Sequence, residues 1–476
     1  MKHNNLAVDD SAISRAHEMS EPIASEEQVG YERGMRMLPI AAILLPLMAY
    51  MNLWITNLVP GYGWFEQTLP RVLLTLLTIG YLMIIWITGP TPRAATLQRA
   101  RLWRSTIGLG MIMLIVLVPT AMFIHDRLIR GPYTENVIDW PLQIEAGSKL
   151  LLSGRSPYAA DYSATEMRLW SERANFPNNP AMHHAIHLPM NFILSALIMP
   201  LWQALTGWYD ARIILLTAYF VVLLIAPRLA RNWEEGHALQ IGLALNPLLV
   251  DTFVVGLSDY LLIAYLVVIL WLRQRGWLRA TACLLGLAVA TRQFSWLLVP
   301  IYVAAEWFAL PQRSTRARLR ELARRIWLLP TIAILVIAPF FLANPRGFYD
   351  DVIAYGSGGV ADAFPIGGPG SFGVSVIVLG MGWVKDRSEQ FPFSLLQLAA
   401  VLPLLGYAVW KQRRQNTLRG MLLSYVIVLA VFLSMGRFMN ENYVGFLFAL
   451  LMLTAFISET PLIPAGVPNE IERVPG

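Results

Sequence analysis

Charged residues are scarce in this chain. They make up 14% of its 476 residues, while 56% of the residues are hydrophobic. Soluble globular domains carry about 25% charged residues, so this composition excludes an ordinary soluble enzyme or binding module. It predicts an integral membrane protein instead.

Cysteine is almost absent as well. Cys283 is the only one, which excludes a disulfide framework and a thiolate metal site. The first 30 residues lack the basic start and apolar core of a secretory signal, and no repeat of solenoid period is present. We therefore expect one polytopic membrane domain over 37–458, flanked by a disordered cytoplasmic tail at 1–36 and a cytoplasmic tail at 459–476.

What the chain does have is a series of long apolar runs. One helical crossing of a bilayer needs about 20 apolar residues, and runs near this length recur along the sequence, which predicts an all-α bundle of about 11 to 13 transmembrane helices. The runs lie at 37–57, 71–89, 105–124, 188–206, 211–227, 239–256, 258–272, 281–291, 294–310, 327–343, 393–410, 419–435 and 442–457.

Arginines indicate how the bundle is oriented. They gather at 93–104, 273–279, 313–325 and 411–419, and basic residues favour cytoplasmic loops. The net charge of +6 is therefore attributed to cytoplasmic loops of a protein in an inner or plasma membrane. It is not taken as a sign of nucleic-acid binding. Both termini are expected in the cytoplasm, and the polar stretch 125–187 is expected to be extracytoplasmic.

One apolar run does not fit this topology. Four runs separate the outer stretch from the arginines at 273–279, although an odd number of crossings is required. Pro189 and Pro200 fall in the run 188–206, and proline kinks helices. We expect this run to be half-length or re-entrant.

The predicted outer stretch carries a series of short motifs. Asp139 and Glu145 are followed by Leu-Leu-Leu-x-Gly-x-x-Pro-Tyr at 150–158 and by His-Leu-Pro-Met at 187–190. This order resembles the GT-C superfamily of multi-pass glycosyltransferases, and within it the bacterial integral-membrane mannosyltransferases. The resemblance extends over about 120–460 and rests on the order of the motifs, since each is weak alone. In the family a Pro-Pro type sequence begins the helix that re-enters the membrane, and here this element is degenerate and reads Leu188-Pro189.

The resemblance implies a glycosyltransferase that uses a polyprenyl-phosphate sugar. Such an enzyme moves a hexose, for example mannose, to a lipid- or polymer-linked acceptor on the extracytoplasmic face, with inversion. Because the donor stays in the bilayer while the acceptor hydroxyl arrives from water, the reaction needs an interfacial site. A carboxylate there can act as general base, worth about 10² to 10⁴ in rate, and cationic groups can neutralise the departing phosphate.

Asp139 is the predicted general base. The same carboxylate is alternatively the N-cap of a helix that begins at Pro141, and the two roles are compatible. Trp140 and Tyr158 are expected either in the interfacial aromatic belt or stacked on a sugar ring. The reserve carboxylates are Asp126, Glu135 and Glu145, and Glu145 is also expected to contact substrate.

Three further polar sites interrupt apolar runs. Arg292 separates two runs that are too short to span comfortably, so it needs a buried anion, either the donor phosphate or an internal carboxylate. Asp259 ends a Gly-Leu-Ser-Asp segment and is either a substrate contact or part of a helix N-cap. The resemblance places ligands of the donor phosphate at Arg292, Arg437 and Tyr443, and the alternative for the last two is an interfacial position.

Neither the histidines nor the glycines predict a cofactor site. His183 and His187 are spaced i, i+4, but Pro180 and Pro189 bracket them and predict irregular chain, so no zinc site is expected. A divalent cation, Mg²⁺ or Mn²⁺, bridging a carboxylate and the donor phosphate is the cofactor that this chemistry allows. The glycine-rich stretch 344–371 lacks a Walker pattern and is expected to be a mobile flap over the acceptor site.

Two other functions share some of these features. A flippase or transporter of lipid-linked sugars would also show buried charges and broken helices, although no inverted repeat is visible. A glycan transferase like the O-antigen ligases or polymerases would also use a large outer loop and arginines. The expected partners are membrane lipids, the polyprenyl-phosphate sugar and a lipid-linked acceptor.

Overall fold

The computed structural model describes residues 64–89, 94–131, 136–174, 176, 179–311, 314–368 and 371–462. Within these ranges the chain consists of helices and their connections, without a β-strand. The predicted all-α fold is therefore confirmed. The predicted tail 1–36 and the apolar run 37–57 lie outside the described residues.

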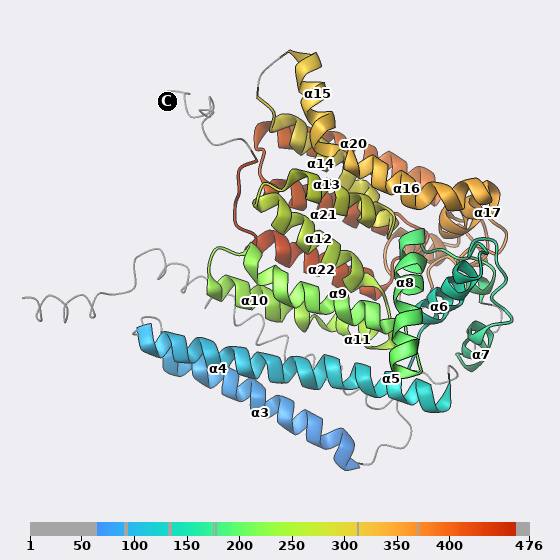
Figure 1. Cartoon of the computed structure of the whole chain (residues 1–476). Coiled ribbons are helices and arrows are strands. Elements are labelled where there is room, and N and C mark those ends of the chain that lie inside the picture. The colour runs from blue at the N-terminus through green and yellow to red at the C-terminus, as the bar shows by residue number, and fades with distance from the viewer. Residues whose placement is uncertain are drawn as a thin grey trace, which may run out of the picture.

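Long apolar helices make up the body of the molecule (Figure 1). In the described part of the chain, four helices are long and apolar enough to cross a membrane, or up to six if each of two bent pairs is one span. The protein is a polytopic membrane protein, and the number of 11 to 13 crossings stays a prediction. The helices are α3 (Trp64–Thr88), α4 (Ala94–Ile112), α5 (Val118–Arg130), α6 (Asp139–Leu152), α7 (Glu166–Arg173), α8 (Pro189–Thr206), α9 (Arg212–Ile225), α10 (Trp233–Ala244), α11 (Pro247–Val255), α12 (Asp259–Gln274), α13 (Leu278–Val289), α14 (Leu298–Phe308), α15 (Thr315–Ile326), α16 (Leu328–Ala343), α17 (Pro345–Tyr349), α18 (Tyr355–Ser357), α19 (Val374–Gly380), α20 (Phe393–Arg414), α21 (Leu418–Ser434) and α22 (Glu441–Phe456).

The helix connections gather at two ends of the body. At the end that we call the basic end, Arg273 and Arg325 both pair with Glu306, at 2.5 and 3.3 Å. Asn416 joins them there by donating to the carbonyl of Ala305 at 2.9 Å. Three arginine-rich connections that are far apart in the sequence therefore lie at one end, as a common membrane face requires. We call the opposite end, where α6 lies, the site end.

Helix α8 is the exception among the long helices. Its first turn is fixed at the site end, because the N–H of Met190 donates to the carbonyl of Ala290 at 3.0 Å. The chain just after its last turn is fixed at the same end, because the N–H of Ala211 donates to Glu145 at 2.8 Å. Figure 1 shows α8 running across the direction of α9 and α12. The run 188–206 is thus the one that fails to connect the two ends, but it is a complete helix, not a half-length or re-entrant one.

A different apolar segment is broken, and its break lies between α10 and α11. These helices bend by 49° at Asn246-Pro247, where proline occupies the first turn of α11. Proline removes a backbone donor and cannot continue the preceding helix. The Asn246 amide instead donates to the carbonyl of Gly445 in α22 at 2.9 Å, so the bend is fixed to a neighbouring helix.

Candidate functional site

The start of α6 is fastened to the turn between α11 and α12. The N–H of Ile138 donates to the carbonyl of Val255 at 2.9 Å. Gly256 follows with φ of +112°, and a Cβ there would lie 2.4 Å from Pro141 Cγ. Glycine is required by both its backbone angle and this close approach. The turn therefore fixes the position of the first residue of α6, which is Asp139.

Asp139 is half-buried at the first position of its helix. The helix begins two residues earlier than the alternative N-cap interpretation assumed, and Ile138 occupies the cap position without a side-chain hydrogen bond. Burial raises the pKa of Asp139 to about 6, partly offset by the N–H groups of Trp140 and of Asp139 itself. A carboxyl group with this pKa is mostly ionised near neutral pH and can take up a proton there.

Arg292 lies between α13 and α14, at the site end. Its Nη2 atom is 2.9 Å from Asp259 Oδ1, and its Nη1 atom donates to Ser258 Oγ at 3.0 Å. The guanidinium group also lies over the rings of Phe294 and Tyr443, at 4.8 and 5.9 Å from their centres. The internal salt bridge that was one of the two alternatives for Arg292 is therefore present.

Asp259, the first residue of α12, is buried and held from two sides. Arg292 lies beside Oδ1, and the Asn442 amide of α22 donates to Oδ2 at 2.8 Å. The cap position of α12 is Ser258, without a side-chain cap hydrogen bond. Asp259 therefore orients the arginine, which leaves its predicted contact with substrate a prediction.

Tyr443 and His187 connect Asp139 with Arg292. Both Asp139 and Arg292 are within electrostatic range of Tyr443. The His187 ring packs edge-on against Trp140, with ring centres 6.2 Å apart. Burial, followed by the charge of Arg292, lowers the pKa of His187 to about 3, so this histidine is neutral at physiological pH. The predicted residues Asp139, Trp140, Asp259, Arg292 and Tyr443 thus form one neighbourhood at the site end.

One comparison with known proteins found a similarity. Residues 145–309 match the model of the alpha-(1->6)-mannopyranosyltransferase family, in its N-terminal domain. This segment, about a third of the chain, is therefore similar to that family. No curated protein matches the chain. The predicted GT-C resemblance is confirmed, and the matched segment includes Arg292, Asp259 and Tyr158 but begins six residues after Asp139.

A second cluster beside this neighbourhood was not predicted from the sequence. His184 Nδ1 lies 2.8 Å from Asp351, and its Nε2 lies 3.0 Å from Asp362. The ring also stacks on Tyr355 at 4.9 Å, and Tyr355 is within electrostatic range of Asp139. Burial alone would lower the pKa of His184, but its hydrogen bonds to the two carboxylates raise it above its usual value. His184 therefore ties the stretch 344–371 to the site.

Glu145 has a different environment from Asp139. Both of its carboxylate oxygens accept from Arg127, at 2.8 and 2.7 Å, and one also accepts from the N–H of Ala211 at 2.8 Å. Arg127 binds Asp210 as well, at 2.8 Å. This network joins α5, α6 and the start of α9, so Glu145 anchors the helix that carries Asp139. The predicted contact of Glu145 with substrate stays a prediction. Of the two other reserve carboxylates, Asp126 pairs with Arg130 at 2.6 Å, and Glu135 lies outside the described residues.

The two predicted aromatic contacts are buried. Trp140 is 3% exposed and Tyr158 is 2% exposed, so neither lies in an exposed aromatic belt. The Tyr158 hydroxyl donates to the carbonyl of His187 at 2.7 Å, which holds that ring beside Trp140. The indole N–H of Trp140 has no hydrogen-bond partner among the described residues. A buried donor without a partner is costly, which marks it as a group that a ligand could satisfy.

Arg437 is occupied by backbone carbonyl groups. Its side chain donates to the carbonyls of Phe364, Arg387 and Glu389, all in the segment that leads from α18 to α20. The residue is almost fully buried. Arg437 therefore holds this segment in place, and the predicted contact with the donor phosphate would need these bonds to be exchanged.

The histidines do not form a metal site with acidic neighbours in the described ranges. No group of three or more His, Cys, Asp or Glu side chains is arranged there to hold a metal ion. His183 is exposed and lies 3.6 Å from Asp161. The divalent cation stays a prediction, since the donor phosphate would supply part of its ligands.

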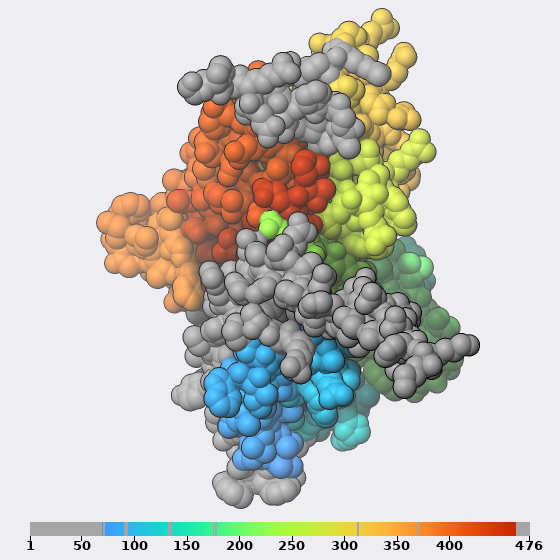
Figure 2. All heavy atoms as spheres, turned by 90° about the vertical axis from the view of Figure 1, so that its left-hand side faces the viewer, coloured from blue at the N-terminus to red at the C-terminus, as the bar shows by residue number. Residues whose placement is uncertain are grey.

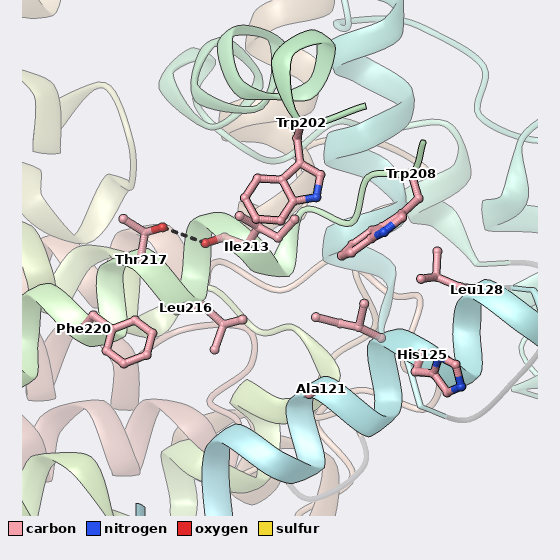
Figure 3. A pocket seen from close by; sticks show the side chains of 10 residues that line it. Ala121, His125, Leu128, Trp202, Trp208, Ile213, Leu216, Thr217 and Phe220 are labelled. Atoms are coloured by element: carbon pink, nitrogen blue, oxygen red, sulfur yellow. Dashed lines mark hydrogen bonds between the residues drawn. The ribbon is translucent and has the colours of Figure 1, made fainter. Parts of the chain in front are cut away.

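An apolar cavity of about 530 Å³ opens between α5, α8 and α9, at the far end of α8. Figure 3 shows Trp202 and Trp208 above His125, with Leu216 and Phe220 deeper along α9. Thr217 uses its hydroxyl within α9, donating to the Ile213 carbonyl at 2.9 Å. The lining contains neither a carboxylate nor an arginine, so this cavity lacks the groups that sugar transfer needs.

Proposed function

We propose that the protein transfers mannose from a polyprenyl-phosphate donor to the hydroxyl group of a lipid- or polymer-linked acceptor, with inversion. In this proposal the site end faces the extracytoplasmic side of an inner or plasma membrane. The observation that carries the proposal is the joint neighbourhood of Asp139 and Arg292, a half-buried carboxylate and a partly buried guanidinium group that both lie near Tyr443. The mannosyltransferase match over 145–309 supports the choice of sugar.

Asp139 is the general base in this proposal. Its carboxylate takes the proton of the acceptor hydroxyl while that oxygen attacks the anomeric carbon. The bond from the anomeric carbon to the phosphate oxygen breaks, and polyprenyl phosphate leaves with the bonding electron pair. Attack from the face opposite the phosphate inverts the configuration. A positioned base contributes about 10² to 10⁴ in rate.

Arg292 binds the phosphate of the donor. A guanidinium group has five N–H donors, and Ser258 and Asp259 do not use all of them. Asp259 fixes the plane of the guanidinium group before substrate arrives, which limits the reorganisation needed when charge develops. The neutral His187 beside it adds no competing charge at this position.

The proposal is tested with purified protein, polyprenyl-phosphate mannose and a lipid-acceptor fraction. Asp139→Asn keeps the shape of the side chain and removes the base, so turnover is expected to fall by about 10² or more. The matched control is Asp161→Asn, an exposed aspartate of the same outer stretch, which is expected to keep wild-type turnover. Equal turnover of Asp139→Asn and the wild type would remove Asp139 as the base.

Donor and stereochemistry are tested in the same assay. The anomeric configuration of the product, determined by NMR, is expected to be opposite to that of the donor. Retention of configuration contradicts direct displacement. Transfer from a nucleotide-activated mannose with no transfer from the polyprenyl-phosphate donor contradicts the assignment of the donor.

A further inference from the structure

Helix α15 differs from every other long helix at the basic end because none of its residues is buried. Leu319, Leu322 and Ile326 follow each other at helical spacing and form one apolar stripe, and Leu319 is 54% exposed. Arginines at 316, 318, 320, 324 and 325 occupy the remaining faces. An apolar stripe opposite a basic face is typical of a helix that lies in the surface of a bilayer.

The direction of α15 agrees with such a position. It is bent by 51° away from α16, the apolar helix that follows it. Trp327 stands at the bend and is 49% exposed, and Trp277 on the neighbouring α12–α13 turn is 56% exposed. Exposed tryptophans are enriched where a bilayer meets water. Figure 2 looks onto this end and shows α15, in yellow, projecting beyond the neighbouring chain at the upper right.

A hollow of about 630 Å³ lies between α15 and the α12–α13 turn. Arg279, Arg324 and Arg325 line it together with a single carboxylate, Glu321. Glu321 is shared by Arg324 and Arg325, at 2.9 and 3.3 Å. Arg279 has no hydrogen-bond or ion-pair partner in the described part of the chain. The hollow therefore has an excess of positive charge and a guanidinium group that is available to an anion.

We propose that this hollow binds the phosphate headgroup of an anionic membrane phospholipid. Arg279 and Arg324 hold the phosphate oxygens, since guanidinium groups suit phosphate through paired N–H donors. The acyl chains lie beside Trp277, which lines the hollow. The occupant is a lipid and not a free anion, because the exposed Trp277 is part of the lining of the charged hollow, at the end of membrane-spanning helices. The site is at the opposite end from Asp139 and does not depend on the proposed reaction.

Native mass spectrometry of the full chain tests this inference. The protein is reconstituted in nanodiscs of phosphatidylcholine with phosphatidylglycerol. The number of phosphatidylglycerol molecules that stay bound after the protein is released from the nanodisc is measured as a function of the lipid concentration. A basic residue near an anionic surface contributes about fivefold to binding, so Arg279→Gln is expected to weaken the retained lipid by about fivefold or more. Phosphatidylcholine alone is expected to leave the hollow empty.

Arg413→Gln is the matched control. Arg413 is an exposed arginine in the last turn of α20 at the same end and does not line the hollow. It is expected to change lipid retention less than twofold. Equal losses in the two variants would mean diffuse surface charge and overturn the site. Displacement of the lipid by millimolar inorganic phosphate would assign the hollow to a free anion and also overturn the proposal.

Discussion

Helix α6 carries two carboxylates six residues apart in opposite surroundings. Glu145 is bound by Arg127 and by the N–H of Ala211. Asp139 has no ion-pair partner among the described residues, and burial raises its pKa to about 6. The middle of the helix is therefore an anchor, and its first residue is left chemically available. One short helix thus carries a structural carboxylate and, at a separate position, the carboxylate that we propose as the base.

Removing the ion pair between Arg127 and Glu145 is expected to have the largest effect on stability. Arg127→Met leaves Glu145 buried without its cation, while Asp210 keeps its salt bridge with Arg212. Such an unpaired buried charge costs about 3 to 5 kcal/mol. We expect little or no monodisperse protein after detergent extraction, as measured by size-exclusion chromatography. Arg130→Met removes a more exposed arginine of the same helix, whose ion pair is worth about 0 to 1 kcal/mol. Similar losses for the two variants contradict the anchor.

The arginine of the proposed site is expected to affect binding and not folding. Arg292→Lys keeps the charge but cannot reproduce the fork that Ser258 and Asp259 hold, and hydrogen bonds to charged groups contribute about 1.5 to 3 kcal/mol. The KM for the donor is expected to rise about 10- to 100-fold, with the unfolding temperature little changed. Arg346→Lys, at an exposed position of the site end, is the control. An unchanged donor KM for Arg292→Lys would remove Arg292 from the donor site.

The ionised carboxylate of Asp139 is expected to lower the free energy of unfolding. A pKa raised from 3.8 to about 6 means that the folded state binds this proton more tightly than the unfolded state. Its contribution to the free energy of unfolding therefore falls as the pH rises from about 4 to about 6. At pH 8, Asp139→Asn is expected to be more stable than the wild type by about 1 to 2 kcal/mol. The two proteins should converge near pH 4, and a variant less stable at pH 8 contradicts the account.

The smallest expected effect is at His184. Its raised pKa means that the protonated ring, which donates to both Asp351 and Asp362, is lost as the pH rises through that pKa. Amide hydrogen exchange in 350–364 is expected to speed up with pH beyond its intrinsic dependence. His184→Asn should remove this extra dependence and weaken acceptor binding about two- to tenfold, the value of one hydrogen bond. Persistence of the extra dependence in the variant would assign it to another group.

Composition and periodicity were enough to predict the fold class and the common end of three of the four arginine clusters. Low charge and long apolar runs leave few alternatives to a helical membrane bundle. Counting the crossings also identified 188–206 as the apolar run that does not connect the two ends of the body. Its geometry was not predictable, because a helix that lies across a bundle has the same composition as one that spans it.

Partnerships across long sequence distances could not be predicted. His184 and Asp351 are 167 residues apart, and the three carbonyl groups bound by Arg437 carry no mark in the sequence. A charged residue in an apolar run shows only that it needs a partner. Arg292 illustrates the limit, because its position in the sequence allowed either the donor phosphate or an internal carboxylate as its partner, and the fold supplies Asp259.

The central claim is that Asp139 is the base, and the pH dependence of kcat/KM tests it most directly. The carboxylate must be ionised to accept a proton, so for the wild type kcat/KM is expected to rise with pH through about 6 and then level off. The residual activity of Asp139→Asn should lack this rise. A wild-type profile that is flat across this range, or a rise that persists in Asp139→Asn, would contradict the account.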